Sequence, residues 1–184
     1  MISVAAPYTR EFPRPECLDH VTSNDHTADA ERLIDFLREK IPQALAMDLR
    51  LGKANEYMLS LAAPLTPNIN DKGCAFGGSL SSVMTLSGWA LVELALRQRG
   101  EDCDVFVAES SVRYLAPVWR DFHSEAQLSP EAHWDTFFTT LEARGRARIS
   151  VSCMVPGEDG APAATLNARF VAKRRHAAPI HADA

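Results

Sequence analysis

Residues 79–98 are the most apolar stretch of this 184-residue chain and form its longest predicted helix. Apolar side chains such as Leu80 and Leu91 occupy nearly every side of that helix. A helix that is apolar almost all round must be enclosed by other elements on most sides. Because Ser87 and Glu93 interrupt the stretch, we predict a buried core helix and not a membrane span.

The segments around this helix predict the sheet that encloses it. Two strands are expected between Met47 and Ala62, and a shorter helix at 28–40 precedes them. Later strands are expected at 105–117, 122–128, 136–144, 146–155 and 163–173, where 136–155 is either two strands or one long strand bent at Gly145. The predicted fold class is α+β, with a curved antiparallel sheet around one long apolar helix and an N-terminal helical extension.

Composition and length indicate one folded domain. The chain is 46% hydrophobic and 23% charged, which is ordinary for a globular protein. We expect an irregular N-terminal arm at 1–27, the domain at 28–175 and a flexible tail at 176–184. A single antiparallel sheet leaves open edges, so a homodimer or tetramer that joins two sheets is expected.

Charge and cysteine usage exclude several classes of function. A net charge of −5 and a pI near 5.7 argue against a nucleic-acid partner. The four cysteines, at 17, 74, 103 and 153, form no CxxC pair, so a metal site is not expected. The N-terminus lacks a basic segment followed by an apolar one, and the expected location is the cytoplasm.

The loop before the long helix carries the residues with chemical potential. Gly77 and Gly78 allow close approach to the backbone, and the first N–H groups of a helix have no internal acceptors. These groups, with Ser79 in or before the first turn, can bind a carbonyl oxygen that becomes an oxyanion. Upstream, Asn70 can orient a carbonyl or a water and Asp71 can act as a base. The alternative is that these residues only form a tight turn.

The stretch Pro67-Asn68-Ile69-Asn70-Asp71-Lys72-Gly73-Cys74-Ala75-Phe76-Gly77-Gly78-Ser79-Leu80, with Leu86-Ser87-Gly88-Trp89, resembles the thioesterase domain at the C-terminus of YiiD-type proteins. The resemblance spans about 41–173 and includes the strand 110–117. That family belongs to the hotdog superfamily, so the resemblance implies a hotdog fold and an acyl-thioester substrate. The acetyltransferase domain that precedes the hotdog in some relatives is not implied, because only about forty residues precede the resemblance here.

This sequence departs from the wider superfamily at two positions. The superfamily loop Asn-x-x-Gly-x-x-His-Gly-Gly places its Asn on Asn70 and its first Gly on Gly73, but its His on Phe76. The acidic residue often found seven positions after the second Gly corresponds to Thr85. Asp71 is therefore the best substitute for the acid, and Glu93 and Glu109 are weaker ones.

The resemblance implies an acyl thioesterase acting on acyl-CoA or acyl-carrier-protein thioesters. Hydrolysis needs no cofactor, because the coenzyme A moiety belongs to the substrate. The expected catalytic residues are Asn70, Asp71 and Thr85, and the expected substrate contacts are Asn68, Gly73, Phe76, Gly77, Gly78, Ser79 and Arg113. Arg113 equally fits an acid across a dimer. The alternative is a non-catalytic acyl-thioester or lipid-binding module, since Phe76 stands where relatives have a histidine and Thr85 where they have an acidic residue.

Overall fold

The computed structural model describes residues 23–55 and 57–175, which form four α-helices, one 3-10 helix and six strands. In chain order these are α1 (Ser23–Lys40), α2 (Pro42–Ala46), β1 (Arg50–Ala54), β2 (Met58–Ala63), η1 (Thr66–Asn68), α3 (Gly77–Gln98), β3 (Cys103–Tyr114), β4 (Phe122–Leu128), α4 (Trp134–Arg144), β5 (Arg146–Pro156) and β6 (Pro162–Arg174). Most of the predicted arm, residues 1–22, and the predicted tail, 176–184, lie outside the described residues.

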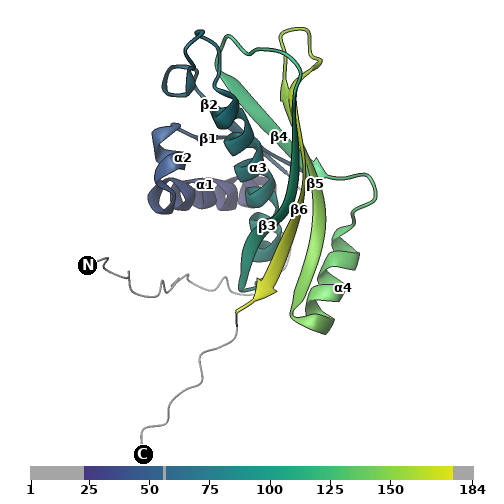
Figure 1. The fold of residues 1–184 in the computed structure, drawn as a ribbon. Coiled ribbons are helices and arrows are strands. Elements are labelled where there is room, and N and C mark those ends of the chain that lie inside the picture. Colours follow the sequence, from purple (N-terminus) through teal and green to yellow (C-terminus); the bar gives the residue numbers. More distant parts are fainter. Residues whose placement is uncertain (1–22, 56, 176–184) are drawn as a thin grey trace, which may run out of the picture.

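The six strands form one antiparallel sheet in the order β1-β2-β4-β5-β6-β3 (Figure 1). The longest pairings join β6 to both of its neighbours. On one side β3 pairs with β6 from Cys103 opposite Arg174 to Tyr114 opposite Ala164, with an irregularity between Val107 and Glu109. Strand β3 is therefore an edge strand, at the opposite end of the sheet from β1.

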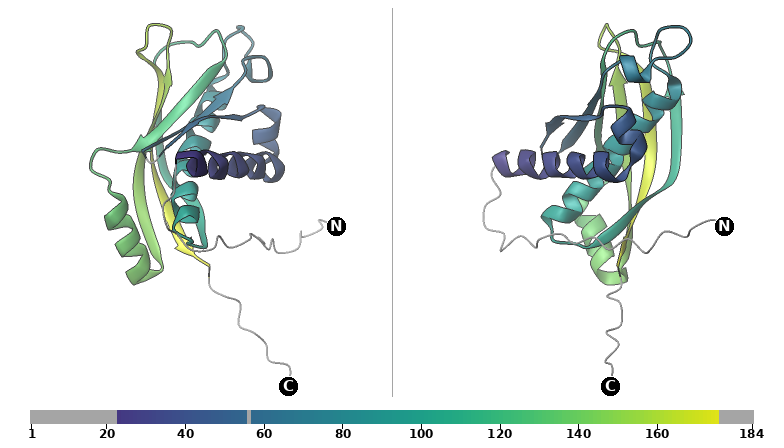
Figure 2. Two further views of the ribbon diagram at one scale, coloured as in Figure 1. Left: turned by 180° about the vertical axis from the view of Figure 1, so that it is seen from behind. Right: turned by 90° about the vertical axis from the view of Figure 1, so that its left-hand side faces the viewer.

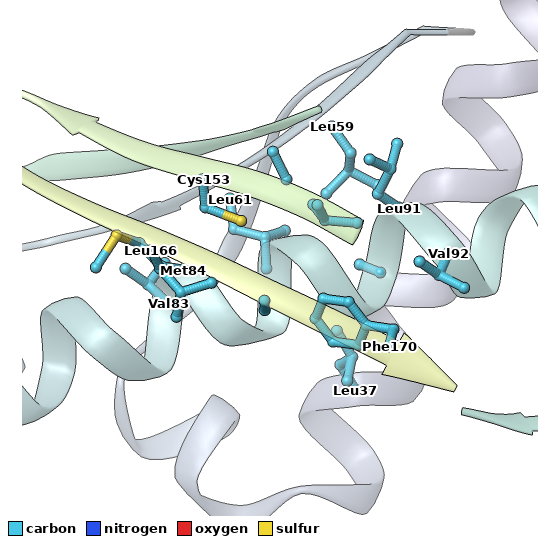
Figure 3. Packing of buried hydrophobic residues seen from close by; sticks show 14 of the residues in the cluster. Leu37, Leu59, Leu61, Val83, Met84, Leu91, Val92, Cys153, Leu166 and Phe170 are labelled. Atoms are coloured by element: carbon cyan, nitrogen blue, oxygen red, sulfur yellow. The ribbon is translucent and has the colours of Figure 1, made fainter. Parts of the chain in front are cut away.

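Helix α3 lies across one face of the sheet and supplies much of the core (Figure 2). Figure 3 shows Val83 and Met84 of α3 packed among side chains of β5 and β6. The approach is close at Gly88, where a Cβ would lie 2.9 Å from the ring of Phe170. Helix α3 is long and apolar enough to cross a membrane, but two-thirds of that stretch (67%) is buried within the fold. Its apolar character is therefore what a wrapped core helix requires, as predicted.

Helix α1 packs against α3 and β1, on the same side of the sheet as α3 (Figure 2). It buries Ala30, Leu33, Ile34 and Leu37, which recur at intervals of three and four residues and so share one helix face. The predicted helix at 28–40 is confirmed, but it begins five residues earlier, at Ser23. The N-terminal helical extension of the sheet is thus longer than the sequence indicated.

The predicted strand at 136–144 is wrong, because these residues form helix α4. Trp134, Phe137, Phe138 and Leu141 follow helical spacing, and Phe137 and Leu141 are buried. The three aromatic rings pack at centroid distances of 5.1 to 5.9 Å. Gly145 is the left-handed residue that ends the helix, with φ of +64°, and not a bend in a strand. The β-forming preference of Thr and Phe was overridden by packing on the far side of the sheet from α3 (Figure 2).

Candidate functional site

The segment between β2 and α3 is a compact turn held by its own backbone and by the side chain of Asn70. A β-bridge joins Ile69 and Ala75, and the backbone N–H of Asn70 donates to the Cys74 carbonyl at 2.8 Å. The Asn70 Oδ1 accepts the N–H groups of Lys72 at 2.8 Å and Cys74 at 3.3 Å, and its Nδ2 donates to the Cys74 sulfur at 3.2 Å. Gly73 has a φ of +88°, which favours glycine. In this structure Asn70 therefore shapes the turn.

Asn68 fixes this turn to the body of the protein. Its side chain is only 1% exposed, and its Nδ2 donates to the carbonyls of Met47 at 3.0 Å and Pro64 at 2.7 Å. Its own carbonyl accepts the Phe76 N–H at 2.7 Å. Asn68, predicted as a substrate contact, thus points into the fold and away from solvent.

Asp71 lies at the exposed tip of the turn. Its carboxylate accepts two hydrogen bonds from the Lys72 ammonium, both of 2.9 Å, and the two side chains are 78% and 71% exposed. No other partner of Asp71 occurs among the described residues. The Asp71 carboxylate is accessible to a bound molecule. Within one chain, no contact of this side chain orients it toward the start of α3.

The start of α3 presents unpaired backbone donors. The helix begins at Gly77, two residues earlier than predicted, with Phe76 in extended conformation at the N-cap and Ser79 in the first turn. The first amide with an acceptor is that of Leu80, which donates to the Phe76 carbonyl at 3.0 Å. Within the described part of the chain, the N–H groups of Gly77, Gly78 and Ser79 have no acceptor. Together with the positive end of the helix dipole, they can stabilise a negatively charged oxygen.

Two aromatic side chains contact the glycines that carry these donors, and a third lies beside the turn. The Phe76 ring lies over Gly78 so closely that a Cβ there would overlap it. Tyr114, at the end of β3, contacts Gly77, and its hydroxyl donates to the Gly77 carbonyl at 3.0 Å. Trp119 lies 4.0 Å from the position that a Gly73 Cβ would take. The last two contacts were missed from the sequence, although Tyr114 stands beside the predicted Arg113 and belongs to the strand that carried the resemblance.

The other predicted residues lie apart from this group. Thr85 is eight positions beyond Gly77, which is about 12 Å along the helix axis. Arg113 neighbours Tyr114 in β3, so its side chain projects from the opposite face of the sheet. Glu93 lies still further along α3, where it is 3% exposed and pairs with Arg97 at 3.1 Å. Glu109 pairs with Arg169 at 3.5 Å on the face away from α3.

The described thiols and acids do not suggest another reaction centre. Burial raises the pKa of Cys153 to about 12, and burial together with nearby Glu101 does the same for Cys103. Both thiols are therefore protonated and unreactive near neutral pH. Among the residues that the structure describes, no group of three or more His, Cys, Asp or Glu side chains could hold a metal ion.

Two pockets lie elsewhere on the molecule. One of about 640 Å³ is lined by β3, β5, β6 and residues 129–137, and includes Arg148 and Arg169. The other, of about 260 Å³, lies beside β2 and β4. Neither is lined by the turn or by the start of α3. In a single chain, the unpaired N–H groups at the start of α3 therefore have neither of these pockets beside them to enclose an acyl chain.

Several solved protein structures have the same fold as this chain. A Chlorobaculum tepidum protein of unknown function has a TM-score of 0.76 and 27% identity, covering 82% of this chain and 97% of its own. A structure titled as the putative thioesterase from Shewanella oneidensis has a TM-score of 0.71 and 28% identity, covering 80% and 99%. The E. coli PaaI protein from the phenylacetic acid degradation operon, at 12% identity, has a TM-score of 0.57 over 82% and 96% and shows the fold alone.

The family model described as "Putative thioesterase (yiiD_Cterm)" matches residues 30–174, which is most of the chain. The match includes the turn, the whole of α3 and all six strands. The chain therefore belongs to this thioesterase family and has the hotdog fold.

Proposed function

We propose that this protein hydrolyses acyl thioesters of coenzyme A or of acyl carrier protein, without a cofactor and in the cytoplasm. The observation that carries the proposal is the trio of unpaired N–H groups on Gly77, Gly78 and Ser79 at the start of α3, where the two glycines are half-buried and Ser79 is buried. When water attacks a thioester, the carbonyl oxygen gains negative charge, and these donors stabilise that charge more than the neutral carbonyl. The family membership supports the same reaction class.

In this proposal Asp71 is the general base. Its carboxylate is exposed at the turn that leads into α3, and only Lys72 pairs with it among the described residues. A carboxylate can deprotonate a water that is positioned against the thioester carbon. Asn70 contributes by holding the turn, and Phe76 provides an apolar surface at the position where relatives place a histidine.

A direct assay tests the proposal. The full chain would be incubated with acyl-CoA thioesters of short, medium and long chain length, and with acyl carrier protein thioesters, while free CoA or carrier thiol is separated chromatographically. Time-dependent release of thiol supports hydrolysis. Because Phe76 and Thr85 replace the usual reactive side chains, the second candidate is a binding module. Saturable binding with no thiol released from any substrate would favour that module.

We further propose that the active form is a homodimer in which β3 pairs with β3 of a second copy. Strand β3 has twelve residues, it lies at the edge of the sheet, and Phe106, Val107 and Tyr114 remain 41–57% exposed. Such an edge is a template for strand pairing unless something covers it. Antiparallel pairing across a twofold axis would extend the sheet and bring a second subunit beside Tyr114.

The charges on β3 favour one register for this pairing. Centring the axis on Ser111 places Glu109 of each copy opposite Arg113 of the other, on the face away from α3. Centring it on Glu109 or Arg113 would oppose like charges, which is destabilising. Arg113 has no ion-pair partner among the described residues, so the Ser111 register supplies one. We therefore assign Arg113 to the interface and not to the substrate.

A further inference from the structure

The end of β3 is connected to the start of α3 by one side chain. The Tyr114 hydroxyl donates to the Gly77 carbonyl oxygen at 3.0 Å, and its ring lies in contact with Gly77. The ring remains 55% exposed, so it contributes little to the core. The one described hydrogen bond of the Tyr114 side chain is to this carbonyl. We therefore expect Tyr114 to act on the start of α3.

The bond acts on the peptide group that carries one of the site donors. The Gly77 carbonyl and the Gly78 N–H belong to the same amide. A donor on the carbonyl oxygen draws electron density from the amide nitrogen and strengthens its N–H as a donor, because linked hydrogen bonds polarise one another. The Gly78 N–H itself has no acceptor among the described residues, so this polarisation is available to a ligand.

We infer that Tyr114 is a positioning residue for the reaction: it orients and polarises the Gly77–Gly78 peptide so that the Gly78 N–H binds the developing oxyanion. This inference rests on the proposed thioesterase function and adds a residue to its machinery. Because β3 is also the proposed pairing strand, Tyr114 links the subunit interface to the carbonyl site.

The substitution Tyr114→Phe tests the inference, because it removes the hydroxyl and keeps the ring. The expected result is a fall of about fivefold in kcat, equivalent to one neutral hydrogen bond, with KM for acyl-CoA nearly unchanged. Tyr57→Phe is the matched control. Tyr57 is 77% exposed in the turn between β1 and β2, and loss of its hydroxyl should leave kcat unchanged.

A second measurement does not depend on turnover. In the free protein labelled with ¹⁵N, Tyr114→Phe should shift the Gly78 amide proton to lower frequency, whereas Tyr57→Phe should not. An unchanged kcat in Tyr114→Phe would overturn the inference. So would a loss of rate accompanied by a lower melting temperature and a raised KM, since those indicate a structural role. If the wild-type chain releases no thiol, the proposed function fails, and the Gly78 shift alone then decides whether Tyr114 polarises this peptide.

Discussion

The Phe76 ring lies directly over Gly78, so that a Cβ on Gly78 would overlap the ring and lie 2.9 Å from its Cδ1 and Cζ atoms. At the adjacent Gly77 a Cβ would meet Tyr114 no closer than 3.5 Å, which is ordinary van der Waals contact. The Phe76 ring therefore excludes a side chain at Gly78, whereas Gly77 has room for one.

This difference predicts different outcomes for two alanine variants. Gly78→Ala forces the Phe76 ring to rotate and crowds the donors of the first turn, so kcat/KM should fall at least about tenfold. Gly77→Ala fits the available space and should retain most of the activity, because alanine also favours the helix. Steady-state kinetics on both variants provide the comparison. Equal losses in the two would contradict the role given to the Phe76 ring.

Asn68→Ala should destabilise the fold. The change leaves the carbonyls of Met47 and Pro64 without their buried donor, and the expected loss in the free energy of unfolding is about 2–3 kcal/mol. Urea denaturation followed by circular dichroism measures it. Asn55→Ala, at an exposed turn where Oδ1 accepts two amides at 2.9 Å, should cost about 1 kcal/mol or less. A loss at Asn68 no larger than that at Asn55 would argue against its anchoring role.

Asp71→Asn should separate catalysis from folding. The side chain is exposed, so its replacement should leave the urea midpoint unchanged, whereas loss of a general base typically lowers kcat by about 10²-fold or more. Lys72→Ala is the control, because it removes the ion-pair partner and keeps the carboxylate. An Asp71→Asn enzyme with wild-type kcat would show that another group, or an unassisted water, performs the deprotonation.

Charge exchange on β3 tests the proposed register. Arg113→Glu would bring two pairs of like charges together across the twofold axis, and the dimer Kd should rise about tenfold or more. Adding Glu109→Arg to the same chain restores opposite charges and should recover the dimer. Sedimentation velocity at several concentrations gives each Kd. If the double variant dissociates at least as readily as the single one, the axis does not pass through Ser111.

Gly145→Ala should destabilise the junction between α4 and β5. The residue has φ of +64°, and alanine there is strained although no atom lies within 4 Å of the added Cβ. The expected cost is about 1 kcal/mol in the free energy of unfolding, measured by thermal or urea denaturation. Gly145→Asn should cost less, because asparagine tolerates this conformation better. A wild-type midpoint for Gly145→Ala would contradict the strain.

Local patterns in the sequence were sufficient for most of the elements. The all-round apolar character of 79–98 predicted the core helix, and the strand predicted at 122–128 is β4, Phe122–Leu128. The segment 136–144 was predicted wrongly because Thr and Phe favour strands, whereas the spacing of Phe137 and Leu141 is helical. The sequence also indicated Gly77 and Gly78 as candidate carbonyl-binding residues at the helix start, although the helix was predicted to begin at 79 and begins at Gly77.

What only the tertiary structure decided is which side chains meet at that terminus. Strand β3 follows α3 in the chain but pairs with β6 at the sheet edge, and this topology brings Tyr114 to the Gly77 carbonyl. It also turns Asn68 inward and places Arg113 on the opposite face. Such contacts join residues 37 positions apart, and no local periodicity encodes them. The sequence by itself determined the position of the helix start that is proposed to bind a carbonyl, because helix ends are local, whereas the residues around it depended on long-range strand pairing.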